Sequence, residues 1–142
     1  MKDTISQGEK SEQIFATECF VGRGYMVSLP NGTADYDLIV DVNGSLKKVQ
    51  VKSTSRDNGN VMICKGSNGQ GNKGRGKYPY PKGSIDFFAL HDVKKDKWYI
   101  VPRSATGDAK QLRIAQKREG KYSVWENNWE FSEIPKMSNT LF

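Results

Sequence analysis

The chain has 142 residues, of which 36% are hydrophobic and 27% charged, a composition typical of one globular domain with its own core. No apolar run has the length of a membrane span, and the first residues lack a secretory signal pattern, so we expect a cytoplasmic protein without a membrane partner. The net charge of +6 is compatible with a nucleic-acid partner, although solubility alone would also explain it.

The first predicted element is a helix that begins near residue 6. Ser6 and, three residues later, Glu9 form the pattern of a capping box, while Gly22 and Gly24 are typical of a helix end. We therefore expect the helix to end before residue 24.

Glu12 stands on the apolar stripe of this helix, in line with Gly8, Phe15 and Cys19. An acid there either lies at the margin and reaches solvent, or is held at a site where a buried carboxylate has a partner. Cys19 and Cys64 each stand among apolar neighbours, which predicts buried thiols rather than a disulfide or a zinc site.

Three strands are predicted next, over residues 24–30, 36–42 and 45–53. Asn43 and Gly44 separate the last two and form a strong signal for a two-residue hairpin turn. With that turn, Asp37 lies directly opposite Gln50, and Asp35 lies opposite Lys52.

Side chains alternate between the two faces of such a hairpin. The face that we expect to be core carries Tyr36, Leu38, Val40, Val42, Val49 and Val51. The opposite face carries Asp35, Asp37, Ile39, Asp41, Leu46, Lys48, Gln50 and Lys52. Acidic, amide and ammonium groups therefore meet at the end of the hairpin away from the turn.

This polar face has two interpretations. An acid opposite a lysine can be a plain cross-strand ion pair, which contributes about 0.2 to 1 kcal/mol. The same groups also suit Mg²⁺, because Asp37 offers a carboxylate, Gln50 an amide oxygen and Val51 a backbone carbonyl. Lys52 would hold or deprotonate a water beside the metal, an arrangement suited to hydrolysis of a phosphodiester.

A basic, glycine-rich stretch without Asp or Glu follows, and we expect it to form a mobile loop over about residues 65–84. Its basic and aromatic side chains are of the kind that contact a phosphate backbone or stack on bases, although a solvated linker is the alternative. The candidates for DNA contact are Lys65, Lys73, Arg75, Lys77, Tyr78, Tyr80 and Lys82.

Two more strands are predicted in "SIDFFALHDVKKDKWYIVPRS", which is consistent with a mixed sheet. His91 is the only histidine, which argues against a histidine-ligated zinc enzyme. A later basic cluster adds Arg113 as a candidate DNA contact or as part of a solvated face. The tail over about residues 135–142 is expected to be loose, and no second domain is indicated.

Together these elements resemble the PD-(D/E)XK nuclease superfamily. Its pattern is a glutamate on a helix, an aspartate near the start of the second strand, and Glu-x-Lys on the third. The matching residues here are Glu12, Asp37, Gln50 and Lys52. "YDLIVD", "VQVK", "IDFFAL" and "YIVP" are similar to a small branch that includes homing endonucleases of cyanobacterial group I introns. "GEKSE" resembles the start of archaeal-type Holliday-junction resolvases.

The resemblance implies an α/β (α+β) single domain, with a central mixed β-sheet flanked by helices and a restriction-endonuclease-like core. It implies a Mg²⁺-dependent endonuclease acting on double-stranded DNA, with Mn²⁺ as a substitute. Glu12 would be a catalytic carboxylate and a metal ligand beside Asp37, Gln50 and Val51, and Lys52 would be the catalytic lysine. In-line attack would leave a 3′ hydroxyl and a 5′ phosphate.

The favoured function is a sequence-specific homing-type endonuclease that makes double-strand breaks. Cutting both strands needs two sites, so we expect a homodimer or a homotetramer. A structure-selective Holliday-junction resolvase is one alternative. A catalytically inactive DNA-binding module is the other, because Gln50 stands where most of the superfamily has an acid.

Overall fold

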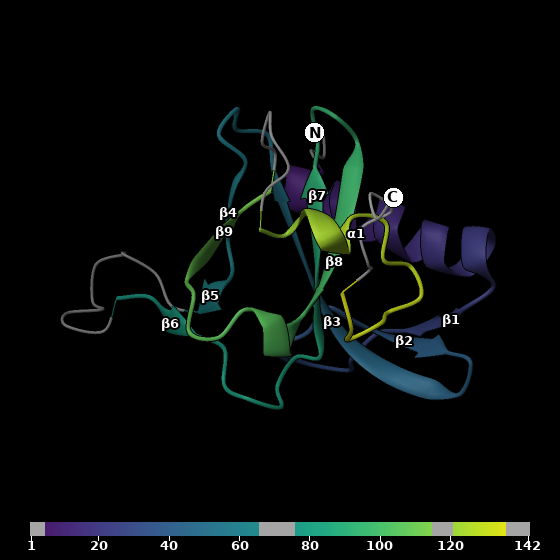
Figure 1. The fold of residues 1–142 in the computed structure, drawn as a ribbon. Coiled ribbons are helices and arrows are strands. Elements are labelled where there is room, and N and C mark those ends of the chain that lie inside the picture. The colour runs from purple at the N-terminus through teal and green to yellow at the C-terminus, as the bar shows by residue number, and fades with distance from the viewer. Residues whose placement is uncertain (1–4, 66–75, 115–120, 136–142) are drawn as a thin grey trace, which may run out of the picture.

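The computed structural model describes residues 5–65, 76–114 and 121–135. A five-stranded sheet in the order β1-β2-β3-β7-β8 is the centre of the fold (Figure 1). Its strands are β1 (Met26–Ser28), β2 (Leu38–Val42), β3 (Ser45–Thr54), β7 (Phe87–Asp92) and β8 (Lys97–Pro102). β3 and β7 run parallel and the other neighbours are antiparallel, so the sheet is mixed, as predicted.

Helix α1 (Gln7–Thr17) begins close to the predicted residue, and the helical segment continues beyond Thr17 in another form. The Ser6 side chain accepts a hydrogen bond from the Glu9 backbone N–H at 3.2 Å, as expected of an N-cap. After a π-helical turn (Glu18–Gly22), Gly24 N donates to Phe20 O at 3.1 Å, and Gly24 has a φ of 75°. A left-handed glycine with this bond is the αL motif of a helix end, so Gly24 was correctly predicted to close the helical segment.

The β2–β3 hairpin has the predicted register, from Leu38 opposite Val49 to Val42 opposite Ser45. The φ of Gly44 is 95° and that of Asn43 is 53°, as a two-residue turn with positive φ at both positions requires. β2 starts only at Leu38, whereas β3 continues to Thr54. The second half of β3 therefore extends past the end of its neighbour.

Both faces of the sheet carry a hydrophobic core. Figure 1 shows α1 on one side of the sheet and the smaller strands on the other. The first core joins Phe15 and Cys19 to the inward residues of β2 and β3, together with Trp129. The predicted core face of the hairpin is confirmed by Leu38, Val40, Val42, Val49 and Val51, whereas Tyr36 is half-buried.

The second core lies on the opposite face of the sheet, the face on which β3 carries Gln50 beside Phe88. It packs Phe88 and Leu90 against β4 (Asn60–Met62) and β9 (Gln111–Arg113), which pair antiparallel. Of the polar residues that the hairpin carries on this face, Gln50 is only 8% exposed, whereas Asp37 and Lys52 are half-buried.

The range 65–84, where we expect a mobile loop, has paired strands at its two ends. β5 (Cys64–Lys65) pairs with β6 (Tyr78–Pro79), and Tyr80 is buried directly after β6. Residues 66–75 lie outside the described residues, as do residues 136–142 of the expected tail.

The remaining short helices are 3₁₀ turns at η2 (Arg103–Ala105) and η3 (Ser123–Trp125). Cys19 and Cys64 are buried free thiols, as predicted. In the part of the chain that the structure describes, no helix combines the length and the apolar character needed to cross a membrane.

Candidate active site

Asp37 lies directly before β2. Its carboxylate accepts a hydrogen bond from β3 where a backbone carbonyl of a neighbouring strand would otherwise do so. Its Oδ2 accepts a hydrogen bond from the Val51 N–H at 2.8 Å, and its own N–H donates to Val49 O at 2.8 Å. These two bonds fix the side chain against the part of β3 that extends past β2.

The Val51 carbonyl points to the same edge of β3 as the Val51 N–H that Asp37 binds. The N–H and C=O of one strand residue point to the same neighbour, and the Val51 N–H points to Asp37. The Val51 oxygen is therefore directed to the edge where the ladder with β2 has ended, which suits the ligand role predicted from the sequence.

α1 is fixed on the sheet by polar contacts close to Glu12. Gln7 Nε2 donates to Ser53 Oγ on β3 at 3.0 Å. Ser11 Oγ lies 2.8 Å from Nδ1 of His91, whose ring stacks on Trp98. The buried stripe of the helix runs through Ser11 and Phe15, so Glu12 lies at its margin and is half-buried.

Glu12, Asp37 and Lys52 lie within electrostatic reach of one another. Burial, then the negative charges of Asp37 and Glu9, raise the pKa of Glu12, while Lys52 acts in the opposite direction. Burial also raises the pKa of Asp37, against the opposing effects of the Val51 hydrogen bond and Lys52. Both carboxylates would therefore gain stabilisation from a further cation.

The Gln50 side chain has a fixed orientation. Its Nε2 donates to the Asp35 carbonyl at 2.5 Å and lies 3.4 Å from the Tyr80 hydroxyl. Because a carbonyl can only accept, the NH₂ end must face Asp35, and Oε1 is left as the acceptor available to a ligand. A carboxylate at this position would place one oxygen against another.

Tyr80 contributes to the site in a way that the sequence did not indicate. The ring is 7% exposed and packs against Phe88 with 5.8 Å between centroids, so stacking on a base, as expected from the sequence, does not fit its burial. Burial and the carboxylates of Asp37 and Asp35 raise its pKa to about 12. The hydroxyl therefore stays protonated, and Lys52 Nζ lies 5.9 Å from the ring centroid.

These donors fit a hard divalent cation better than zinc. Among the described residues, no three His, Cys, Asp or Glu side chains cluster closely enough to hold a metal ion. Two carboxylates, one amide oxygen and one backbone carbonyl form an all-oxygen set, which Mg²⁺ and Mn²⁺ accept together with water. Asp37, Glu12, Gln50 and Val51 would hold such an ion.

The other predicted DNA contacts are distributed more widely. Lys65 forms an ion pair with Asp35 at 2.6 Å, which ties β5 to the site. Tyr78 is 45% exposed and Lys77 half-buried beside it.

Lys82 lines a cleft of about 530 Å³ that also contains Asp86, Asp108 and Glu133, an unfavourable lining for a phosphate. Arg113 is exposed on β9. Lys73 and Arg75 lie outside the described residues.

Comparisons with known proteins bear on the family and the fold. A family model described as PD-(D/E)XK endonuclease matches residues 2–132. A search of the curated proteins gives no match. Among solved structures, a bacterial homing endonuclease, I-Ssp6803I, superimposes with a TM-score of 0.73 at 22% sequence identity, over 87% of this chain and 88% of that chain.

The structural likeness supports the predicted restriction-endonuclease-like, α+β fold. The family match spans nearly the whole chain and includes the helix, the hairpin and the downstream strands. A nuclease is the class of protein that the family match supports. The chain belongs to the PD-(D/E)XK endonuclease family.

Proposed function

We propose that the protein is a divalent-metal-dependent endonuclease of double-stranded DNA. The observation that carries the proposal is the meeting of Glu12, Asp37 and Lys52 around the edge of β3, with the Gln50 amide fixed beside them. The two carboxylates, each with a raised pKa, favour a bound cation, and a lysine beside them favours a phosphate or a nucleophilic water.

Each residue has a distinct role in this proposal. Asp37 is the principal metal ligand, and Glu12, the Gln50 Oε1 and the Val51 carbonyl complete the set. A bound Mg²⁺ or Mn²⁺ would polarise the scissile phosphate and lower the pKa of a water. Lys52 orients or deprotonates the attacking water and offsets charge on the phosphate, so that in-line attack leaves a 3′ hydroxyl and a 5′ phosphate.

The proposed biological activity is a sequence-specific double-strand break of the homing type. The likeness to a bacterial homing endonuclease supports it. A single site cuts a single strand, so the active form is a homodimer or a homotetramer. Because the substrate is DNA, we place the activity in the cytoplasm of the cell or of a phage host.

The test is a cleavage assay on linear duplex, supercoiled plasmid and a four-way junction, each with Mg²⁺, with Mn²⁺ and with EDTA. We expect cuts at defined sequences in the duplexes with either metal, and none with EDTA. Cleavage of junctions irrespective of sequence would replace homing by junction resolution. Binding without cleavage of any substrate would show an inactive DNA-binding module.

A further inference from the structure

A cleft of about 250 Å³ adjoins Lys52 at the end of β3. Its lining consists of Gln7, Lys52, Ser53, Thr54, Ser55, Arg56, Asn60 and Met62. Cations, hydroxyls and amides provide nearly all of this lining, and it includes no carboxylate. The cleft near Lys82 is larger but has three acidic residues, so the two clefts suit different ligands.

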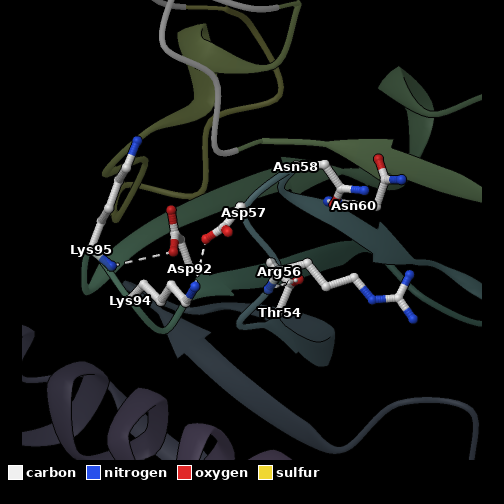
Figure 2. Close-up of polar contacts among 8 residues, drawn as sticks. All are labelled: Thr54, Arg56, Asp57, Asn58, Asn60, Asp92, Lys94 and Lys95. Carbon is white, nitrogen blue, oxygen red and sulfur yellow. Dashed lines mark hydrogen bonds and ion pairs between the residues drawn. The ribbon is translucent and has the colours of Figure 1, made fainter.

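Arg56 is an exposed cation of this cleft, and among the described residues its guanidinium has no hydrogen-bond or ion-pair partner. Its backbone N–H donates to Thr54 Oγ1 at 3.1 Å, which fixes the start of the turn after β3. The neighbouring Asp57 is held by Lys94 Nζ at 2.5 Å. Figure 2 shows the Arg56 side chain extending away from this pair. Within the described part of the chain, no ion pair engages its guanidinium.

The two walls of the cleft are fixed by hydrogen bonds. On one wall, Gln7 of α1 donates to Ser53. On the other, Asn60 Oδ1 accepts a hydrogen bond from Arg113 Nε at 3.2 Å, across the register that pairs β4 with β9. A second arginine, predicted from the sequence as a DNA contact, is therefore bonded to a residue that lines the cleft.

We propose that this cleft binds one backbone phosphate of the DNA, next to the phosphate that is cut, with Arg56 as its principal cation. Lys52 borders both the catalytic site and the cleft. The scissile phosphate and the phosphate in the cleft would therefore be neighbours on one DNA strand. The cleft is smaller than those that enclose drug-sized ligands, so it suits a phosphodiester and not a flipped nucleotide. Such a contact positions the strand without reading its sequence. The inference rests on the proposed nuclease function.

The test compares Arg56→Ala with Lys94→Ala, which removes the same charge from a lysine already paired with Asp57. DNA affinity is measured in EDTA over a range of salt concentrations. For Arg56→Ala we expect weaker binding of all duplexes and a plot of log affinity against log salt that is shallower by about 0.9, the value for one lost phosphate contact. Lys94→Ala should keep the wild-type slope.

A wild-type slope for Arg56→Ala, or an equal loss for Lys94→Ala, would overturn the assignment of the cleft while leaving the nuclease function intact. Absence of DNA binding by the wild-type protein would overturn both. Once the cut is mapped, a duplex with a neutral methylphosphonate next to the scissile phosphate gives a second test. It should weaken binding by the wild type and not by Arg56→Ala; equal weakening of both would contradict the proposal.

Discussion

At the scale of single residues, the glutamine in the family's acidic position is explained by its neighbours. The Gln50 amide donates to the Asp35 carbonyl, a bond that no carboxylate can make. The sequence showed the departure from the family pattern. It did not show the cause, because Asp35 acts through a backbone atom and Tyr80 is thirty positions away.

Gln50→Glu is therefore expected to slow cleavage about tenfold or more. An ionised glutamate would place a negatively charged oxygen against the Asp35 carbonyl oxygen, and a protonated glutamate would be a poor metal ligand. Leaving a buried polar group without its hydrogen-bond partner costs about 1 to 3 kcal/mol, which corresponds to about a tenfold change in rate or more. Single-turnover rates with Mg²⁺ measure the effect. Tyr80→Phe removes only the longer contact and should cost less. Cleavage by Gln50→Glu at the wild-type rate would show that the Asp35 carbonyl does not decide this position.

Glu12 gives a prediction about stability and pH in the metal-free protein. Burial raises its pKa, so its contribution to stability is fully present below the pKa of the unfolded chain. That contribution is lost as the pH rises through the higher pKa of the folded state. Glu12→Gln should therefore raise the Tm at neutral pH in EDTA, and the gain should shrink towards about pH 4, near the ordinary glutamate pKa.

Thermal unfolding across this pH range is the measurement, with Glu133→Gln as the control because Glu133 is exposed and lines the other cleft, near Lys82. We expect no pH-dependent gain for the control. A lower Tm for Glu12→Gln at neutral pH would contradict the account, since it would mean that the carboxylate is favourably paired without a metal.

At the scale of elements, local signals were sufficient for α1 and for the hairpin. Ser6 and Gly24 act within their own turns, and Asn43-Gly44 fixes the register of the strands next to it. The parallel pairing of β3 with β7 and the pairing of β4 with β9 depend on contacts distant in sequence, so the alternation of side chains in the hairpin could not show that Gln50 is buried.

The turn itself can be tested by Gly44→Ala. Gly44 has a φ of 95° and nothing within 4 Å of an added Cβ, so the cost is that of the backbone alone. We expect a loss of about 1 to 2 kcal/mol in the free energy of unfolding, measured with denaturant. Gly8→Ala, within α1, should not lower stability, because alanine is the better helix former. Equal stability of Gly44→Ala and wild type would show that this turn does not constrain the hairpin.

At the scale of the whole molecule, the candidate site lies where β3 extends beyond the end of the neighbouring strand β2. β3 continues past the start of β2, and its edge is left to Asp37, to Glu12 from α1 and to the Tyr80 segment after β6. The sequence predicted the four family residues and their common location. Tyr80 was predicted only as a DNA contact, and its position beside Gln50, like the role proposed for Arg56, follows from the folded sheet.

The central claim is that Lys52 acts in phosphodiester hydrolysis at a site built on Asp37. The most direct measurement is the single-turnover cleavage rate of Lys52→Ala on a DNA that the wild type cuts, beside Lys48→Ala. Lys48 lies on the same face of β3 and contacts the Gly83 carbonyl, so it controls for loss of a lysine from this strand. The account predicts a loss of about a hundredfold or more for Lys52→Ala and a wild-type rate for Lys48→Ala. Cleavage by Lys52→Ala as fast as the wild type would contradict it.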